Sequence, residues 1–185
     1  MTDVEPWDRL NSEYLGDYRI FRLRQDRSVS PRTGATHTFF VLEAPNWINV
    51  LPITPEGKIL MVRQYRHGRG EVTLEIPAGM CDPGEKDPAL SARRELLEET
   101  GYVPERLIHI GTVTPNPAFL DNACHTFLAQ DVRPVGGQQL VGAEDIALAL
   151  LDFDAIDDLV ANGGIRHSLT LNALFWYERF RRRGE

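Results

Sequence analysis

The chain has 185 residues, of which 42% are hydrophobic and 25% charged, as in ordinary globular proteins and unlike disordered or fibrous ones. Its formal net charge of -7 argues against a polyanionic partner, because proteins that follow a nucleic-acid backbone carry a basic surface. We therefore expect no nucleic-acid partner. Small anionic ligands are compatible with this composition, because nearby arginines or a metal ion can bind them although the net charge of the protein is negative.

The length fits one medium domain with its own core, so we expect a single domain over residues 1–185. The two cysteines, Cys81 and Cys124, form no CxxC motif and no metal-binding spacing. The amino-terminal stretch MTDVEPWDRL is acidic and has no apolar run, and no segment approaches the ~18 apolar residues of a membrane span. We expect a cytoplasmic protein that has no membrane partner.

Alternation of apolar and polar residues, β-type composition and intervening turn residues predict a series of strands. In chain order the expected strands are 19–27, 36–44, 47–54, 58–66, 71–79, 106–114, 123–132 and 145–151. The strands expected at 47–54 and 58–66, which the turn PEG joins, are interpreted as a hairpin of two buried strands. Helices are expected at 88–100, 154–162 and 168–183. Strands mixed with helices in this way favour an α/β sandwich.

The helix at 88–100 has the clearest boundaries. Asp87 stands at the N-cap position and Pro88 at the first helical position, which is a favoured start. Gly101 provides the left-handed residue that commonly ends a helix. At 100° per residue its apolar residues form one face, and its glutamates lie on the opposite side with Arg94 beside them. The apolar set is Ala89, Leu90, Ala92, Leu96 and Leu97, and the acidic set is Glu95, Glu98 and Glu99.

Like charges at helical spacing repel each other, so the three glutamates need a reason to stay together. A surface helix with arginine–glutamate pairs is one explanation. The upstream segment EIPAGMCDPGEKDP favours another, because a strand and a glycine-rich loop precede the helix and Glu85 adds a fourth carboxylate. Hard cations such as Mg²⁺ bind oxygen ligands and often share them with substrate phosphates. A cation would explain why the repulsion is tolerated.

These residues resemble the Nudix box, which reads glycine, five residues, glutamate, seven residues, then Arg-Glu-aliphatic-x-Glu-Glu-x-Gly followed by an aliphatic or aromatic residue. The matching positions are Gly79, Glu85, Arg94, Glu95, Leu96, Glu98, Glu99, Gly101 and Tyr102. One departure is present: eight residues, Lys86 to Arg93, separate Glu85 from Arg94. We place the extra residue at Lys86–Asp87, before the helix, so that only the position of Glu85 is affected.

The resemblance implies a Nudix-type α/β/α sandwich with a mixed sheet and a hydrolase that cleaves a nucleoside diphosphate linked to another group. It also implies a divalent metal, Mg²⁺, for which Mn²⁺ can substitute. Carried over by position, Glu95 and Glu99 bind the metal together with the main-chain carbonyl of Ala78. Glu98 is a further ligand or the base, and Arg94 holds the glutamates in place.

The segments VRQYR and LEIPAG look like the branch of the family that hydrolyses ADP-ribose and other nucleoside diphosphate sugars, here to a nucleoside monophosphate and a sugar phosphate. In that branch the residue matching Arg66 contacts the diphosphate, and the one matching Glu75 lies near the metals. Pro117 stands where ADP-ribose enzymes carry a proline, although a loop proline is weak support by itself. The expected partner is therefore a small nucleotide sugar.

The loop before the strand at 145–151 is a second source of a catalytic base in that branch, and here it offers Glu144. The residues leave open whether Glu98 or Glu144 is the base. Aromatic side chains can hold a nucleobase by stacking, and Trp7, Trp47 and Phe119 are candidates. Phe119 is the one we assign to substrate binding, whereas Trp47 stands in an apolar strand and is interpreted as core.

No histidine pair has the i, i+4 spacing of a metal site, so we assign no chemistry to the five histidines. The branch forms homodimers through amino-terminal strands, and by analogy we expect residues 1–44 to contain a dimerisation segment and 45–185 the catalytic core. Two alternatives stay open. The chain can instead act on nucleoside triphosphates or dinucleoside polyphosphates, or it can be a Nudix-fold nucleotide-binding module without turnover.

Overall fold

The computed structural model describes residues 3–184, and the chain divides into two compact units. Unit 1 consists of the amino-terminal segment up to Pro45 together with Thr114–Ala123, and unit 2 consists of Asn46–Val113 and the segment from Cys124 onward. Residues 114–123, which the sequence reading assigns to the catalytic core, belong to unit 1. Among residues 3–184 no helix combines the length and the apolarity that crossing a membrane requires.

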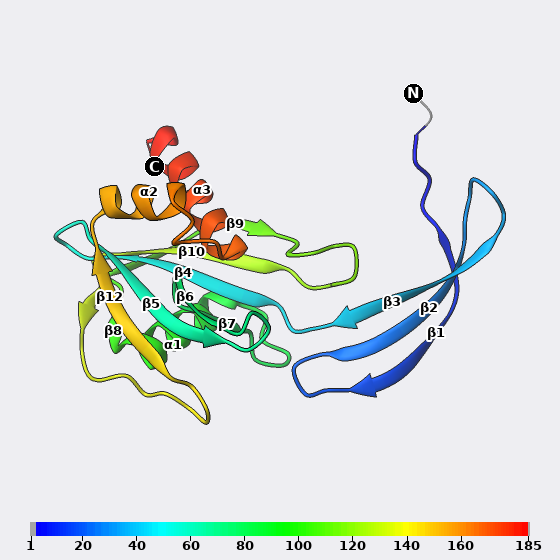
Figure 1. Ribbon diagram of the computed structural model, residues 1–185, viewed down its shortest axis with the longest axis horizontal. Coiled ribbons are helices and arrows are strands. Elements are labelled where there is room, and N and C mark those ends of the chain that lie inside the picture. Colours follow the sequence, from blue (N-terminus) through cyan, green and yellow to red (C-terminus); the bar gives the residue numbers. More distant parts are fainter. Residues whose placement is uncertain (1–2, 185) are drawn as a thin grey trace. The chain divides into compact units, whose positions relative to one another are not determined.

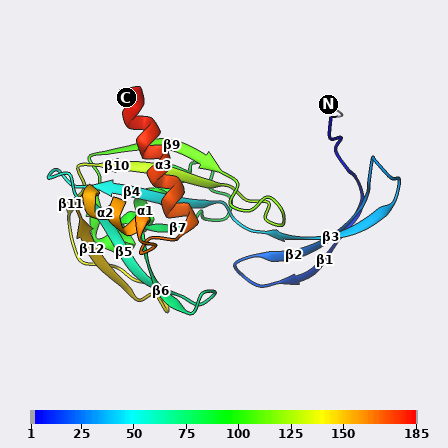
Figure 2. The same ribbon diagram turned by 45° about the horizontal axis from the view of Figure 1, so that its top comes forward.

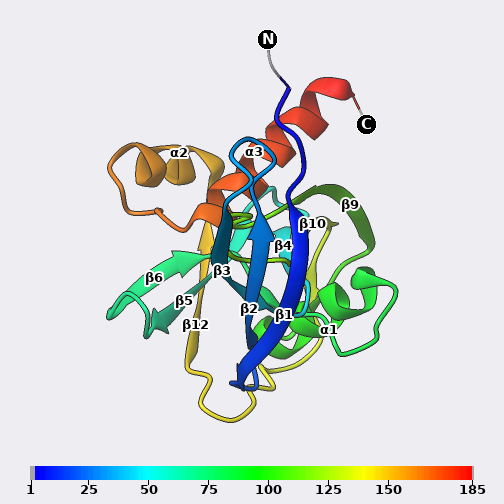
Figure 3. The same ribbon diagram turned by 90° about the vertical axis from the view of Figure 1, so that its right-hand side faces the viewer.

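Unit 1 contains an antiparallel sheet of three strands in the order β1-β2-β3 (Figure 3). The strands are β1 (Asp8–Asp17), β2 (Arg22–Val29) and β3 (Thr36–Glu43). The second and third correspond to the predicted strands 19–27 and 36–44. The first was not expected, because DRLNSEYLGD has no regular alternation, and nearly all of its residues are exposed. A bridge between Leu42 and Leu120 connects the 114–123 segment to β3.

Unit 2 is built on a mixed seven-stranded sheet with the main order β12-β5-β4-β10-β9, in which β6 pairs with β5 and β7 pairs with β4. Only the β4–β10 pair is parallel. The strands are β4 (Trp47–Ile53), β5 (Ile59–Arg66), β6 (Glu71–Glu75), β7 (Ala78–Met80), β9 (Arg106–Val113), β10 (Cys124–Gln130) and β12 (Ile146–Leu151), with a small extra pair formed by β8 (Tyr102–Val103) and β11 (Arg133–Pro134).

The predicted hairpin of β4 and β5 is present, but the two strands pair only next to their turn, at Ile53 and Ile59. Farther along, β6 takes the place beside β5 and β7 takes the place beside β4. The single strand expected at 71–79 is therefore two strands, because Pro77 interrupts the run and the chain crosses from β5 to β4 at that point. This crossing positions the end of β6 and the start of β7 for the site described below.

Helices cover both faces of this sheet, with α1 (Pro88–Thr100) on one face and α2 (Phe153–Ala161) and α3 (Ser168–Arg183) on the other (Figure 1). Alternation along β4 supplies both hydrophobic cores: Ile48 and Val50 pack with α1, while Leu51 packs with α2 and α3. The last helix crosses β4, β10 and β9 (Figure 2). The predicted α/β/α sandwich with a mixed sheet is confirmed.

The caps of α1 are those that the sequence predicts. The Asp87 side chain accepts a hydrogen bond from the Ala89 amide at 3.0 Å, and Pro88 is the first helical residue. Gly101 adopts φ 74°, a left-handed conformation that is unfavourable for other residues, and its amide donates to the Leu97 carbonyl. These caps fix where the helix begins and ends, and hence which residues of the Glu95–Glu99 segment face the sheet.

Candidate active site

The acidic ridge, defined as Glu95, Glu98 and Glu99, faces the sheet more closely than the sequence indicates. The buried residues of α1 include Ala92, Leu96 and Glu99, whereas Leu90 is 59% exposed. The expectation that the glutamates lie opposite the anchored face is thus wrong for Glu99. The distribution of apolar residues around the helix does not predict this arrangement, because that method places every charged residue on the solvent-facing side.

Strand β7 lies directly against the ridge and contacts it through its backbone. The Ala78 amide donates a hydrogen bond of 3.1 Å to Glu99 Oε2. In an extended strand the amide and carbonyl of one residue point to the same side, so the Ala78 carbonyl also faces α1. A Cβ at Gly79 would lie 2.1 Å from the Glu95 carboxyl carbon, so glycine at this position lets the Glu95 carboxylate lie against β7.

Arg94 ties the ridge to β7, as the resemblance implies. Its Nη1 donates to Glu95 Oε1 at 2.9 Å and to Glu98 Oε2 at 3.0 Å. Its Nη2 donates to the Met80 carbonyl at 3.1 Å. One guanidinium therefore fixes two carboxylates of the helix and one carbonyl of the strand.

The two inner carboxylates of the ridge are poised to bind a cation. Burial raises the pKa of Glu99 to about 8, with the charges of Glu95 and Glu144 adding to the effect and the Ala78 amide opposing it. Burial also raises the pKa of Glu95 to about 7, against the influence of Arg94. A bound cation would favour the ionised form of both groups, and would thus remove the cost of keeping two carboxylates together.

The donor set of this site fits Mg²⁺. Within residues 3–184 no three Asp, Glu, His or Cys side chains converge closely enough to hold a metal by themselves. The available oxygens are the carboxylates of Glu95 and Glu99 and the carbonyl of Ala78. A hard cation that keeps several waters and shares substrate phosphates matches such an incomplete set of oxygen ligands.

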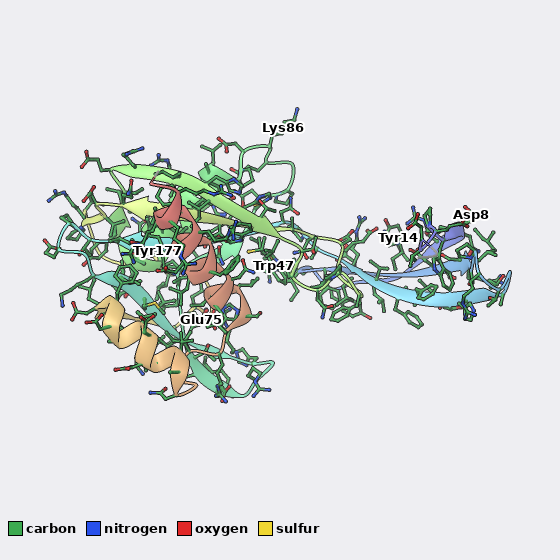
Figure 4. The ribbon with its side chains drawn as sticks, turned by 90° about the horizontal axis from the view of Figure 1, so that it is seen from above. Asp8, Tyr14, Trp47, Glu75, Lys86 and Tyr177 are labelled. Atoms are coloured by element: carbon green, nitrogen blue, oxygen red, sulfur yellow. The ribbon has the colours of Figure 1, made fainter. Side chains whose placement is uncertain are left out.

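Glu85 does not join the ridge. Its carboxylate accepts a hydrogen bond from the Ser91 hydroxyl in the first turns of α1. The preceding loop carries the extra residue of the motif, and Lys86 within it is exposed (Figure 4). The longer loop thus directs Glu85 to the start of the helix rather than toward Glu95 and Glu99.

Beside the ridge, Glu75 and Arg66 form a two-point ion pair. Arg66 Nε and Nη2 donate to the two carboxylate oxygens at 2.9 and 2.7 Å, and the Thr73 hydroxyl donates at 2.6 Å. The Glu75 side chain has no solvent exposure. Burial alone would raise the pKa of Glu75, but the bonds from Arg66 and Thr73 hold it below its ordinary value. The positive charge of Arg66 also acts on Glu99, so this pair and the ridge share one electrostatic environment.

Arg66 lines two cavities. The Trp47 cavity, of about 330 Å³, is lined by Trp47, Ile48, Arg66, Ala78, Gly79, Met80, His167 and Leu169. The Tyr65 cavity, of about 450 Å³, is lined by Gln64, Tyr65, Arg66, His67, Ala143, Glu144 and Asp145. Trp47, which we expected in the core, instead forms part of a cavity wall: it is the first residue of β4, pairs with Met80 at the end of β7 and is only half-buried.

Glu144 lies in the loop before β12, which is fastened to the carboxyl end of α1. The Gln138 amide donates to the carbonyls of Glu99 and Ile146 at 2.7 and 3.0 Å. The Glu144 carboxylate accepts from the Val141 amide at 2.7 Å, and its charge raises the pKa of both Glu95 and Glu99. Gln138 was not found from the sequence, since nothing in GGQQL signals a bridge over such a distance.

The structure thus brings together eight of the nine predicted site residues, all of them in unit 2. They are Ala78, Glu95, Glu98, Glu99 and Arg94 around the β7–α1 contact, the Arg66–Glu75 pair beside it, and Glu144, whose charge acts on Glu95 and Glu99. Phe119 belongs to unit 1, so its role in substrate binding stays a prediction. Sequence reasoning missed His167, which contacts Glu75.

Comparisons with known proteins agree with this arrangement. A model of the NUDIX domain matches residues 44–169. The chain is 41% identical over 92 residues to an ADP-ribose pyrophosphatase of Bacillus subtilis (strain 168), covering 50% of this chain and 49% of that protein. It is 36% identical over 121 residues to the methanol dehydrogenase activator of Bacillus methanolicus, and this match covers 65% of this chain and 64% of that protein. The chain therefore spans about half to two-thirds of the length of these relatives.

Among solved structures, the crystal structure of an ADP compounds hydrolase matches with a TM-score of 0.84 and 21% identity, covering 100% of this chain and 98% of that one. This likeness shows that the fold is shared. The matched NUDIX segment extends from the end of β3 into α3 and contains the acidic ridge, β7 and Arg66. The chain belongs to the NUDIX family.

Proposed function

We propose that this chain hydrolyses the diphosphate bond of ADP-ribose or a related nucleoside diphosphate sugar with Mg²⁺, or Mn²⁺ in its place, and releases a nucleoside monophosphate and a sugar phosphate. The observation that carries the proposal is the placement of Arg66. Arg66 lines both cavities, and its charge acts on Glu99 of the ridge. A diphosphate at this point has a cation site on one side and room for a substituent on either end.

The proposed chemistry divides between the metal and the chain. Mg²⁺ held by Glu95, Glu99 and the Ala78 carbonyl would neutralise charge on the phosphoryl oxygens and activate a water. Arg66 orients the diphosphate, and Glu75 holds Arg66 in the required plane. Arg94 keeps Glu95 and Glu98 in place.

We assign the proton-accepting role to Glu144 rather than Glu98. The Glu98 carboxylate accepts a hydrogen bond from Arg94 at 3.0 Å, so one of its oxygens is already engaged. Among the described residues Glu144 has no ion-pair partner, and its charge acts on both Glu95 and Glu99. The variants Glu144→Gln and Glu98→Gln distinguish the two. We expect kcat to fall about a hundredfold or more in the first and less than tenfold in the second, and the reverse order would assign the base to Glu98.

The substrate class is tested by incubating the protein with ADP-ribose and MgCl₂ and measuring AMP and ribose 5-phosphate. ATP and diadenosine tetraphosphate complete the panel, and Glu99→Gln is the matched control. We expect AMP release from ADP-ribose that depends on Mg²⁺ and is lost in Glu99→Gln. Preferential cleavage of ATP or of the dinucleoside polyphosphate would replace the substrate assignment, and unchanged release in the variant would remove Glu99 from the mechanism.

A second candidate is a binding or regulatory module without turnover, which the name of one relative, methanol dehydrogenase activator, favours. It predicts nucleotide binding with no product. The substrate panel therefore separates the two candidates in one experiment.

We also propose a homodimer formed through the sheet of unit 1. Its charged residues Arg24, Asp26 and Glu43 pair with one another, whereas aromatic side chains stay exposed, such as Tyr14 at 55% and Phe40 at 53%. A two-layered or larger structure is normally needed to bury such a surface. Light scattering should give twice the chain mass for the wild type and a smaller mass for Phe40→Ser; a wild-type monomer would contradict the proposal.

The two cysteines are buried free thiols, which supports the cytoplasmic location that we propose.

A further inference from the structure

The carboxylate of Glu75 is surrounded by four polar groups. Oε1 accepts from Arg66 Nε at 2.9 Å and from the Thr73 hydroxyl at 2.6 Å. Oε2 accepts from Arg66 Nη2 at 2.7 Å and lies 3.1 Å from His167 Nδ1. Arg66 and Thr73 thus donate three hydrogen bonds to the carboxylate, and His167 Nδ1 is a fourth polar group within 3.1 Å of it. Because the side chain is completely buried, water does not replace any of these four partners.

His167 is the one member of this set that comes from a distant part of the chain. It precedes α3, near Glu75, which is labelled in Figure 4. Its Nδ1 also lies 3.1 Å from the hydroxyl of Thr170, a completely buried residue that accepts from the Ile76 amide. An ionised carboxylate only accepts hydrogen bonds, so we assign a ring proton to Nδ1, the nitrogen that faces it. Burial lowers the pKa of His167 despite the opposing influence of the Glu75 charge.

The free donors of Arg66 depend on this arrangement. Two of its five N–H groups donate to Glu75, the other three have no hydrogen-bond partner among residues 3–184, and Arg66 lines the Trp47 and Tyr65 cavities. The plane of the guanidinium follows the plane of the Glu75 carboxylate, because two parallel bonds join them. Whatever fixes the orientation of Glu75 therefore fixes the direction of the free donors.

We propose that His167 is a positioning residue that fixes the plane of the Glu75 carboxylate and thereby aims the guanidinium of Arg66 at the diphosphate of the substrate. The part concerning the substrate rests on the proposed function. Thr73 holds Oε1 from the same strand as Glu75, whereas His167 holds Oε2 from the start of α3. Without the contact from His167, Arg66 Nη2 is the remaining polar neighbour of Oε2, and the Arg66–Glu75 pair can rotate about its own bonds.

The first test is the steady-state kinetics of His167→Ala with ADP-ribose and Mg²⁺. Arg66 binds the diphosphate in the ground state and the transition state alike, so its misalignment raises KM more than it lowers kcat. We expect KM to rise about tenfold while kcat changes less than about threefold. His167→Asn restores a donor at the position of Nδ1 and should recover a near-wild-type KM. His109→Ala, at an exposed histidine on β9, is the matched control and should leave both constants unchanged.

A double-mutant comparison separates positioning from a general structural role. If His167 acts through Arg66, adding His167→Ala to Arg66→Ala should change KM less than about twofold. The same tenfold rise in the Arg66→Ala background would overturn the proposal, as would an unchanged KM in His167→Ala alone. Thermal melts monitored by circular dichroism establish that the variants are folded. Should His167→Ala unfold, the KM is measured for His167→Gln instead, because glutamine moves the donor away from the position of Nδ1.

A measurement that needs no turnover keeps this inference separate from the proposed function. The Arg66 Nε–H resonance, identified by its loss in Arg66→Lys, should be protected from solvent exchange in the wild type and in His167→Asn, and unprotected in His167→Ala. If no nucleotide is cleaved by the wild type, the proposed function fails and the resonance alone decides about positioning. A resonance that stays protected in His167→Ala would refute the role of His167 in either case.

Discussion

The contact between β7 and α1 can be disturbed by adding one methyl group, through Gly79→Ala. The new Cβ would lie 2.1 Å from the Glu95 carboxyl carbon and 2.2 Å from its Oε1. Glu95 would have to retreat by about 1.5 Å to restore an ordinary carbon contact. Since the obstacle is the end of a flexible side chain, leaving its rotamer costs only about 1 kcal/mol of folding free energy. A displacement of this size at a proposed metal ligand costs about a hundredfold in rate.

The assay is kcat/KM for ADP-ribose at saturating Mg²⁺, alongside urea unfolding of the same preparations. We expect kcat/KM to fall about a hundredfold while the free energy of unfolding changes by about 1 kcal/mol. Gly68→Ala is the control, because its Cβ would meet no heavy atom within 4 Å. Wild-type kcat/KM in Gly79→Ala, or a loss explained by unfolding, would refute the reasoning about Glu95.

Three further predictions follow from the burial of the ridge. Glu99→Gln should raise the Tm of the metal-free protein at pH 8, and this gain should become smaller toward pH 5. The reason is that burial raises the pKa of Glu99 from 4.5 to about 8. The wild-type glutamate therefore lowers the stability of the folded state increasingly as the pH rises across that range. Mg²⁺ affinity measured by calorimetry should increase from pH 6 to pH 8.5, with proton release, because the metal displaces protons from Glu95 and Glu99. In urea unfolding, Leu96→Ala should cost about 2–5 kcal/mol and Leu90→Ala less than about 0.5, since the first is fully buried and the second is 59% exposed; equal costs would contradict the observed helix face.

Local signals were sufficient to predict α1 and the motif it carries. The caps at Asp87 and Gly101 depend on neighbouring backbone groups, so their effect can be read from adjacent residues. The burial of Glu99 does not follow from the same residues. It arises because the Ala78 amide of β7 takes up its carboxylate, and that partner is 21 positions away.

The remaining errors have the same origin in long-range contacts. The break between β6 and β7 depends on two different neighbouring strands, whereas the sequence LEIPAG reads as one strand stopped by turn residues. His167 is isolated in the sequence and meets Glu75 only because α3 covers the sheet. Spacing rules for histidine detect sites within one helix, so they do not detect a ring that supports a carboxylate on another element.

The central claim, that Glu95 and Glu99 hold a divalent cation against β7, is tested most directly with Mn²⁺ as a paramagnetic probe. Titration of the protein, followed by the signal of free Mn²⁺ in electron paramagnetic resonance, should reveal a site in the wild type that is occupied in the presence of ADP-ribose. The same titration of Glu95→Gln/Glu99→Gln should show no such site. Absence of Mn²⁺ binding in the wild type, or equal binding by the double variant, would contradict the claim.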